Sequence, residues 1–413
     1  MNPVVKSNRW LVFVAAWLVV ASESATNAIS VFAKPLMAMH EWNLGEVNFA
    51  YTLFQVFFSI FGLVAGKHAD AVGPRASAYA GGLFIGTGWF FSSLCTELWQ
   101  YYIAFGVLLG SGSGCIFIAI LTSVMRWFPD KRGTVSGCLL VAGTISPMVL
   151  SPVANLLIEN FGVLTAYKIF GVGLFVIIAL VAWLLRQAPE NYRPEGWEPT
   201  EKNTINLAAR EYTWKQMLFS PMFYVVFVIF ICAVSAGTMM TTSLSVIAQE
   251  QAKFTAMGAA WVVSLYVGAN FVGRLSFGAL CDKFGAFQAL CISLSITVCG
   301  LACLGLAHSQ PLFYVGAMLM GFAFAGAVVL FPQITGKCFG MKNLGINYGI
   351  MVFGFAAGAY VGPALAGHYR DTASSYTPAF VAAAVIALLG IGITLLVIMR
   401  ERKVRKMKLA DAC

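Results

Sequence analysis

Charged residues are scarce in this sequence. Lys, Arg, Asp and Glu make up 10% of its 413 residues, whereas a soluble domain carries about 25%. Hydrophobic residues make up 59% of the chain. This balance excludes a soluble globular domain and predicts an integral membrane protein, in which each spanning helix needs about 20 apolar residues. The alternation over about ten residues that is typical of transmembrane β-strands is also missing.

Patterns that carry catalysis or bind metals are missing too. The sequence contains only four His, all at the ends of apolar runs, and no HExxH, GxSxG or CxxC motif. The ten Cys lie mostly within apolar runs, where we interpret them as small packing residues rather than metal ligands or disulfide partners. We therefore predict that the protein is not an enzyme and needs no cofactor or metal.

Twelve apolar runs with short connections follow one another along the chain, which predicts an all-α membrane protein with twelve transmembrane helices. The first run resembles a signal peptide, but it is long enough to span a membrane, so we expect no cleavage. The predicted spans are Trp10–Ala33, Gly45–Ala65, Ala76–Cys95, Gln100–Met125, Thr134–Ile158, Thr165–Leu185, Pro221–Ile247, Ala256–Leu280, Phe287–Ala307, Leu312–Thr335, Asn347–His368 and Tyr376–Met399.

The distribution of Lys and Arg predicts the orientation of the chain. With the N-terminus in the cytoplasm, 21 of the 26 Lys and Arg fall in cytoplasmic segments and 4 in outer segments. The positive-inside rule therefore places both termini in the cytoplasm. The net charge of +9 reflects this asymmetry, so we expect no nucleic-acid partner. The basic tail that starts at Arg400 either meets anionic lipid headgroups or is solvated.

A glycine pattern recurs at half the length of the chain. We therefore predict two pseudo-symmetric six-helix bundles, residues 1–186 and 216–413, the second with the basic cytoplasmic tail, joined by a cytoplasmic linker at 187–215. Parallel six-helix repeats are typical of transporters, whose substrate site lies near the membrane midplane between the repeats. At a spacing of 212 residues, the pattern pairs Gly66, Asp70 and Gly73 with Gly278, Asp282 and Gly285, and Gly133 and Gly137 with Gly345 and Gly349.

Arg274 is the only formal charge in the apolar run Ala259–Leu280. Its guanidinium stays protonated and costs about 2.5–3.5 kcal/mol in the membrane interior. Such a residue normally faces an internal cavity and pairs there with an acidic side chain or an anionic substrate. Tyr266 and Asn270 share its helix face at four-residue steps. Alternatively, Arg274 reaches the cytoplasmic surface, which lies about 12 Å away along the helix at Asp282.

Glu23 is the other charge inside an apolar run, and Asn27 shares its helix face. Three roles for Glu23 remain open. It carries a proton during transport, it pairs with Arg274 when no substrate is bound, or it is a neutral acid that is hydrogen-bonded to Ser22 or Ser24. Intramembrane ionisable groups are in general candidates for function.

Two segments, GKHADAVGPR at Gly66–Arg75 and GALCDKFG at Gly278–Gly285, resemble the GxxxDxxGR inner-loop motif of the major facilitator superfamily. The resemblance implies that Asp70 and Arg75, and Asp282 in the second copy, form charge–helix-end contacts that hold the outward-facing state. The second copy has Phe287 where the first has Arg75, which leaves its contact in question. The alternative interpretation of both segments is a solvated turn with glycines at tight positions.

Other segments resemble the oxalate:formate antiporter family, which is close to the bacterial monocarboxylate transporters. The resemblance implies that Arg274 binds a substrate carboxylate, and that the site lies in a bacterial inner membrane. Proton-coupled relatives often have Asp where this chain has Asn270, so we do not expect a proton carrier at that position. The matching segments are NRW (Asn8–Trp10), FAKP (Phe32–Pro35), RWFPDKRG (Arg126–Gly133), APENYRPEGW (Ala188–Trp197), GR (Gly273–Arg274), LFP (Leu330–Pro332) and NYG (Asn347–Gly349).

The same resemblance suggests the kind of substrate. Members that exchange oxalate have Lys at the position of Phe355, so this chain offers one fixed cation for one carboxylate. The aromatic site positions of the family correspond to Phe117, Phe324 and Val328, which predicts a pocket of low polarity. Alternatively, these side chains face lipid or pack within a bundle.

We therefore predict a monomeric secondary transporter of a small monocarboxylate that works by alternating access, with H+ symport or anion exchange, in contact with membrane lipid. The expected substrate-binding residues are Arg274, Asn270, Tyr266, Phe117, Phe324, Val328, Phe355 and Asn27, with Glu23 as the candidate for proton coupling. An oxalate or dicarboxylate exchanger is the alternative among transporters, and a membrane sensor that does not transport organic acids is the alternative outside them.

Overall fold

The computed structural model describes residues 8–28, 32, 35–36, 39–40, 42, 44–189, 192, 194, 211–307, 309–373 and 375–410. Within these ranges the regular elements are all helices, so the predicted all-α fold is confirmed. Their bounds are α1 Arg9–Glu23, η1 Ser24–Ala28, α3 Leu44–Val72, α4 Pro74–Ser92, α5 Leu98–Tyr101, η2 Tyr102–Leu109, α6 Gly110–Trp127, α7 Arg132–Phe161, α8 Val163–Ala182, α10 Trp214–Leu218, α11 Pro221–Gln251, α12 Ala256–Phe284, α13 Ala286–Gly305, α14 Gln310–Phe339, α15 Leu344–Ala373 and α16 Thr377–Ala410.

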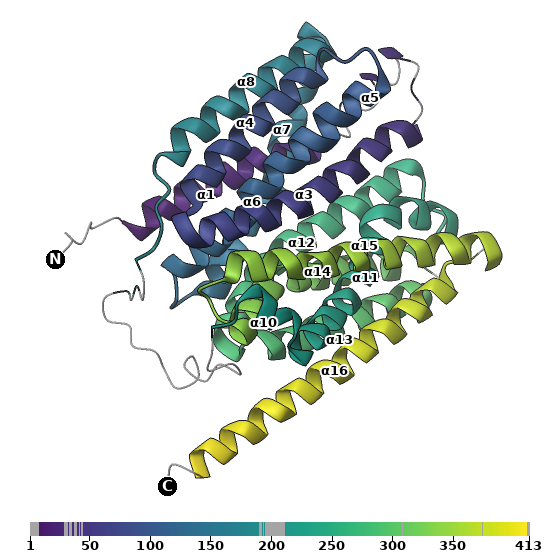
Figure 1. The fold of residues 1–413 in the computed structure, drawn as a ribbon. Coiled ribbons are helices and arrows are strands. Elements are labelled where there is room, and N and C mark those ends of the chain that lie inside the picture. The colour runs from purple at the N-terminus through teal and green to yellow at the C-terminus, as the bar shows by residue number, and fades with distance from the viewer. Residues whose placement is uncertain are drawn as a thin grey trace, which may run out of the picture. The chain divides into compact units, whose positions relative to one another are not determined.

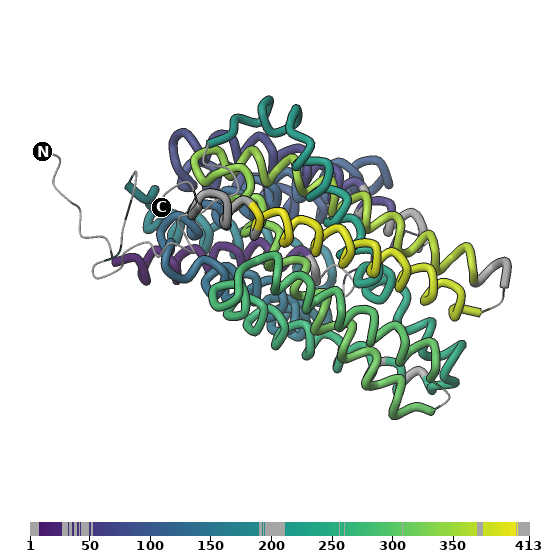
Figure 2. The backbone as a smooth tube through the Cα atoms, turned by 90° about the horizontal axis from the view of Figure 1, so that it is seen from below, coloured from purple at the N-terminus to yellow at the C-terminus, as the bar shows by residue number. Residues whose placement is uncertain are grey.

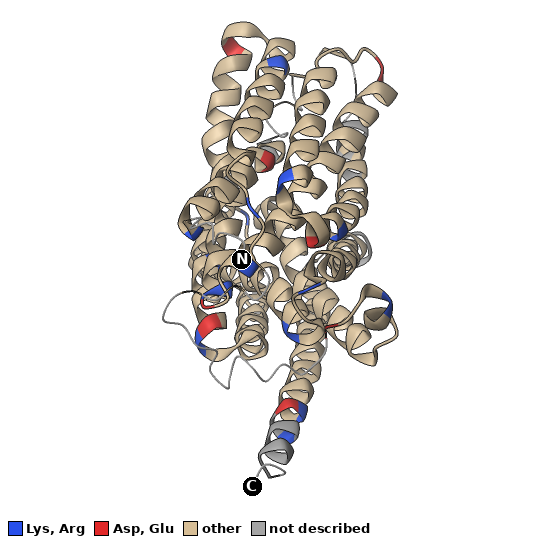
Figure 3. Cartoon of the chain, turned by 60° about the vertical axis from the view of Figure 1, so that its left-hand side comes forward, with Lys and Arg blue, Asp and Glu red and all other residues tan. Residues whose placement is uncertain are grey.

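Each of the twelve predicted spans overlaps a helix or a run of adjoining helices in the described residues. Among these residues, nine helical stretches are long and apolar enough to cross a membrane. The predicted fourth span is built from α5, the π-helical η2 and α6. Figure 3 shows how few charged residues interrupt these long helices.

Cap residues explain where several helices begin. The Asn8 side chain accepts a hydrogen bond from Trp10 N at 3.0 Å, and Thr255 accepts one from Gly258 N at 3.1 Å. Both satisfy backbone N–H groups that an α-helix leaves unpaired in its first turn. Pro74 occupies the first position of α4, where a missing N–H costs nothing.

The chain divides into two compact units. Unit 1 comprises residues 1–130, 139–197 and 342–350, and unit 2 comprises residues 131–138, 198–341 and 351–413. The helices α7 and α15 each contribute their first residues to one unit and the rest to the other. The predicted sequence boundaries of the two bundles, 1–186 and 216–413, stay a prediction.

Within unit 1, α6 packs on α3, α4 and α1, and α8 packs on α4 and α1 (Figure 1). Within unit 2, α14 packs on α11, α12 and α13, and α16 lies along α11 and α13. Figure 2 shows the same course of α16 (yellow) beside the green helices of unit 2. Fully buried aromatic side chains fill the helix interfaces, among them Trp89 and Tyr167 in unit 1 and Phe313 and Phe380 in unit 2.

Candidate functional site

Arg274 lies in the middle of α12, and its side chain is oriented by Asn270. The Arg274 Nε donates to Asn270 Oδ1 at 3.0 Å. The Asn270 Nδ2 donates in turn to the carbonyl of Gly321 on α14 at 3.1 Å. Asn270 is buried, with 6% of its surface exposed. Because Asn270 is neutral, these bonds fix the direction of the guanidinium without cancelling its charge.

Tyr266 lies two helical turns before Arg274 and is also buried. Its hydroxyl donates to the Gly237 carbonyl on α11 at 3.2 Å and lies 2.9 Å from Thr241 Oγ1. The predicted face of Tyr266, Asn270 and Arg274 is therefore tied to α11 at one end and to α14 at the other.

Phe324 meets α11 at the same place as Tyr266. A Cβ placed on Gly237 would lie 2.8 Å from Phe324 Cβ, so only glycine leaves room for this ring. The Phe324 ring centroid is 6.5 Å from that of Phe355 on α15. Three of the predicted site residues thus meet α11: Tyr266, Phe324 and, through the Phe230 ring, Phe355. Val328, one turn after Phe324 on α14, is partly exposed.

The remaining predicted site residues belong to unit 1. Phe117 of α6 is partly exposed, and its ring centroid lies 5.6 Å from that of Phe58. Glu23 is buried at the end of α1, where Ser24 Oγ donates to its Oε2 at 3.1 Å. Ser113 of α6 lies beside the same carboxyl group. Asn27 lies in η1, and its side chain is outside the described residues.

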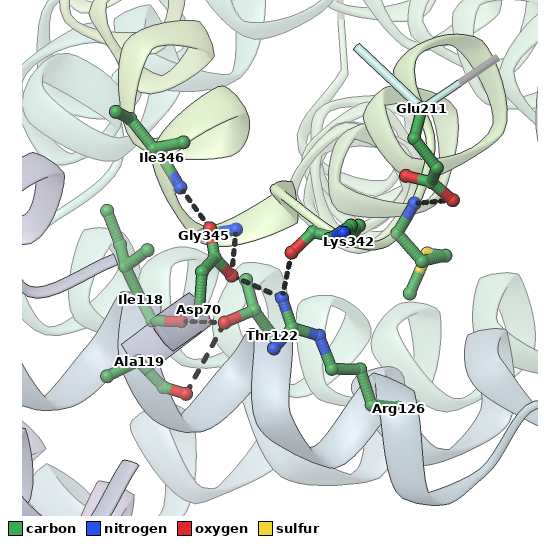
Figure 4. Close-up of polar contacts among 10 residues, drawn as sticks. Asp70, Ile118, Ala119, Thr122, Arg126, Glu211, Lys342, Gly345 and Ile346 are labelled. Carbon is green, nitrogen blue, oxygen red and sulfur yellow. Dashed lines mark hydrogen bonds and ion pairs between the residues drawn. The ribbon is translucent and has the colours of Figure 1, made fainter. Parts of the chain in front are cut away.

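Asp70, at the end of α3, caps the first turn of α15. Its Oδ1 and Oδ2 accept from Gly345 N and Ile346 N, both at 3.0 Å. The Arg126 guanidinium of α6 pairs with Asp70 and donates to the Lys342 carbonyl at 2.9 Å. We call Asp70, Arg126, Gly345 and Ile346 the Asp70 cap (Figure 4). A carboxylate is favourable here because the helix N-terminus carries a partial positive charge.

Asp70 lies beyond the apolar run Gly45–Ala65, at the end of the helix. Burial raises the pKa of its carboxyl group above the ordinary value, and the nearby Arg126 acts in the opposite direction. The cap is therefore largely withdrawn from water, which makes its hydrogen bonds stronger and the loss of any one of them more costly.

Asp282, at the end of α12, caps α7 in the corresponding way within unit 2. Its Oδ1 accepts from Gly133 N at 2.8 Å, and its Oδ2 accepts from Thr134 N at 2.7 Å and from Thr134 Oγ1 at 2.6 Å. From α14, Gln333 Nε2 donates to the Arg132 carbonyl at 3.0 Å and to Ser136 Oγ at 2.7 Å. These five residues and Asp282 form the Asp282 cap.

Each of the two caps lies beside a close crossing of two helices. A Cβ on Gly66 would lie 2.6 Å from the carbonyl carbon of Gly345, and one on Gly278 would lie 2.6 Å from the Gly133 carbonyl oxygen. The glycines that recur in the sequence therefore pair crosswise, α3 with α15 and α12 with α7. Helix backbones can approach this closely only at small residues.

The second copy of the motif thus forms its helix-end contact although Phe287 replaces the arginine. Phe287 is fully buried, and Lys337 Nζ lies 5.1 Å from the centre of its ring. In the first copy, Arg75 does not join the Asp70 cap but holds the end of α8. It donates from Nε to the Leu185 carbonyl at 3.1 Å and from Nη2 to the Trp183 carbonyl at 2.5 Å.

Sequence reasoning missed several residues of these clusters. Arg126 stands in the RWFPDKRG segment, which resembles the oxalate:formate antiporter family, but that resemblance implied no role for this residue. Gln333 is a polar residue in the apolar run LFPQITG, and this isolation was a signal that could have identified it. Thr241 and Gly321 had no such signal. Within the described ranges, no three His, Cys, Asp or Glu side chains come together as metal ligands.

Comparison with known proteins agrees with this architecture. The chain is 25% identical over 404 residues to the oxalate:formate antiporter of Oxalobacter formigenes, covering 97% of this chain and 94% of that protein. It is 23% identical over 406 residues to monocarboxylate transporter 12 of Rattus norvegicus, covering 90% and 81%. In fold it is similar to the human organic anion transporter MFSD10, with a TM-score of 0.74, 13% identity, and 94% and 99% of the two chains covered.

The match to a family model decides the family. The model described as Major Facilitator Superfamily matches residues 12–300 and 226–411, which together cover most of the chain. The sequence motifs predict the major facilitator fold, and the solved structure of MFSD10 has a similar fold to this chain. The long apolar helices imply a multi-pass membrane protein. The chain therefore belongs to the major facilitator superfamily of membrane transporters.

Proposed function

We propose that this transporter carries a small monocarboxylate and that Arg274 binds the carboxylate group. The observation that carries the proposal is the position of Arg274 in the middle of an apolar helix, with Nε held by a buried neutral amide. A guanidinium fixed in direction can donate two parallel hydrogen bonds to a carboxylate. The names of the relatives, an oxalate:formate antiporter and a monocarboxylate transporter, support the same substrate class.

The aromatic surroundings favour one carboxylate with an apolar remainder. Phe324 and Phe355 place two rings beside one another in unit 2, and the face of α12 offers one cation. A dicarboxylate would need a second positive partner, because leaving a charge unpaired in a dry site is costly. Tyr266 donates to the carbonyl of Gly237, the residue against which Phe324 packs, and its hydroxyl lies 2.9 Å from that of Thr241. These two hydroxyl groups give the substrate a polar contact.

The two caps fit a role in alternating access. With the termini in the cytoplasm, the Asp70 and Asp282 caps lie on the cytoplasmic side and hold the first turns of α15 and α7. Because both helices pass from one unit to the other, breaking the caps frees these helix ends to move. We therefore assign both caps to the outward-facing state, in a monomer of the plasma membrane.

Two modes of coupling are compatible with these residues, H+ symport and anion exchange. Glu23 is buried beside Ser24 and Ser113, which suits a group that binds and releases a proton. Asn270 cannot do so, because an amide does not titrate. Anion exchange would need no such group, and the name of the Oxalobacter formigenes relative favours it.

Uptake into proteoliposomes tests the proposal. Radiolabelled monocarboxylates are supplied to the purified wild type, Arg274→Ala and Arg274→Lys. We expect Arg274→Ala to lose at least about 100-fold in kcat/KM, since charge-assisted bonds contribute about 1.5–3 kcal/mol each. Arg274→Lys keeps the charge but not the two-pronged geometry, so it should retain an intermediate rate.

Two results would contradict the proposal. Normal uptake by a folded Arg274→Ala protein would remove Arg274 from the site. Stabilisation of the wild type by monocarboxylates in thermal unfolding, without any flux into proteoliposomes, would support a membrane sensor instead.

A further inference from the structure

Where the chain leaves α8 towards the linker, two side chains of unit 1 hold its backbone. The last carbonyl groups of a helix have no partner within the helix. Arg75 of α4 donates from Nη2 to the Trp183 carbonyl at 2.5 Å and from Nε to the Leu185 carbonyl at 3.1 Å. Trp127 of α6 donates from Nε1 to the Arg186 carbonyl at 2.8 Å. The end of α8 is therefore fixed to two other helices.

Two further contacts extend this attachment. The ring of Tyr192 meets that of Trp127 edge to face, with centroids 5.0 Å apart. A Cβ on Gly73, in the tight turn between α3 and α4, would lie 3.0 Å from the Gln187 Cβ. We call residues 183–189 together with Tyr192 the linker start. The linker start is thus docked on the α3–α4 turn and on the end of α6.

Both anchors of the linker start are close in sequence to a side chain of the Asp70 cap. Trp127 is the last residue of α6 and directly follows Arg126, which pairs with Asp70 and donates to the Lys342 carbonyl at 2.9 Å (Figure 4). Arg75 follows Asp70 by five residues, across the α3–α4 turn. Trp127 is buried, with 3% of its surface exposed. A shift of the linker start therefore also moves the helix end that carries Arg126.

The other end of the linker is attached at the corresponding position of unit 2. Phe339 stands 212 residues after Trp127, which is the spacing of the recurring glycines, and it is the last residue of α14. Tyr212 N donates to the Phe339 carbonyl at 2.9 Å, and the two rings meet edge to face with centroids 5.9 Å apart. In each unit, an aromatic residue at the same position of the repeat thus holds one end of the linker.

We propose that the linker start is a brace for the Asp70 cap. Its attachment to Arg75 and Trp127 keeps Asp70 and Arg126 in position to hold the first turn of α15, and its displacement opens the cap. The linker thereby regulates the outward-facing state, a consequence that rests on the proposed alternating-access function. Trp127 has a positioning role, because it acts on the cap through Arg126.

Hydrogen–deuterium exchange of the purified full-length protein, without substrate, tests the proposal. The amides of Gly345 and Ile346 donate to Asp70, so their exchange accelerates when the cap opens more often. The measured quantity is the deuterium uptake of a peptide that covers residues 342–350. Melting temperatures of all variants establish that they are folded.

Trp127→Phe keeps an aromatic ring but loses the N–H donor. We expect it to accelerate the exchange of residues 342–350 about fivefold, the factor that corresponds to one neutral hydrogen bond. Tyr192→Leu changes a partly exposed ring and should accelerate it about threefold. Trp99→Phe makes the first change at an exposed site of unit 1 and should match the wild type. In an Arg126→Gln background, Trp127→Phe should add nothing, since both act on one contact.

Three results would overturn the proposal. The first is wild-type exchange of residues 342–350 in Trp127→Phe, or in Tyr192→Leu if Trp127→Phe does not fold. The second is an equal effect of Trp127→Phe with and without Arg126→Gln, because Trp127 would then not act through Arg126. The third is equal acceleration in residues 131–138 of unit 2, which would indicate general destabilisation. Because no substrate is present, failure of the monocarboxylate assignment is a separate outcome.

Discussion

Replacing Gly66 by Ala should open the Asp70 cap. The new Cβ would lie 2.6 Å from the carbonyl carbon of Gly345, where ordinary contact between carbon atoms needs about 3.5 Å. The helices α3 and α15 must then separate by about 1 Å. The two bonds from Asp70 to Gly345 N and Ile346 N, now 3.0 Å long, would stretch past the range of a hydrogen bond.

The size of the effect follows from those two bonds. Each hydrogen bond to a charged group contributes about 1.5–3 kcal/mol. If the variant loses the free energy of about one such bond, about 2 kcal/mol, the equilibrium between closed and open caps shifts about thirtyfold. Hydrogen–deuterium exchange measures this shift directly, because the amides of Gly345 and Ile346 are the donors. Exchange in a peptide covering residues 342–350 should accelerate by about this factor when opening limits it.

Gly173→Ala in α8 is the matched control, because a Cβ there meets no atom within 4 Å. It makes the same chemical change in the same unit and should leave the exchange of residues 342–350 unaltered. Equal exchange rates of residues 342–350 in Gly66→Ala and Gly173→Ala would contradict the idea that the close crossing of α3 and α15 keeps the Asp70 cap closed. Gly278→Ala, with Gly268→Ala as its control, repeats the experiment at the start of α7.

Two further predictions concern coupling and specificity. Glu23→Gln should remove the dependence of uptake on an inward proton gradient while the rate without a gradient changes little; an unchanged gradient dependence in proteoliposomes would exclude Glu23 as the proton carrier. Phe355→Lys should raise the uptake of dicarboxylates relative to monocarboxylates by about tenfold, since a second cation can pair with a second carboxylate; unaltered relative rates would contradict the charge argument.

The sequence was sufficient for the helices and for the family. Long apolar runs leave a helix as the structure that satisfies its backbone in a membrane, so the twelve predicted spans coincide with helices. The repeated glycines were also recognisable, because their spacing is a property of the chain alone. Of the candidate site, the shared face of Tyr266, Asn270 and Arg274 followed from the helical period.

What the sequence could not supply is which helices meet. The repeat aligns Gly66 with Gly278, but in space Gly66 meets Gly345 and Gly278 meets Gly133. Likewise, the amide of Asn270 is held by Gly321, 51 residues away. Such contacts depend on the rotation and depth of each packed helix, which apolar composition leaves undetermined since every face is hydrophobic. Phe287 does not prevent the Asp282 cap, because Asp282 bonds to backbone and hydroxyl groups of α7.

The Asp70 cap also sets an order in the maturation of the protein. Asp70 and the backbone amide of Gly345 are 275 residues apart in the chain. At about 5–20 residues per second during synthesis, tens of seconds pass between the synthesis of Asp70 and that of Gly345. During this time the Asp70 carboxylate has no helix end to cap. Unit 1 receives its last segment, residues 342–350, only after most of unit 2 has been made. A nascent chain truncated before α15 would lack this contact, and its Asp70 would have no helix end to cap.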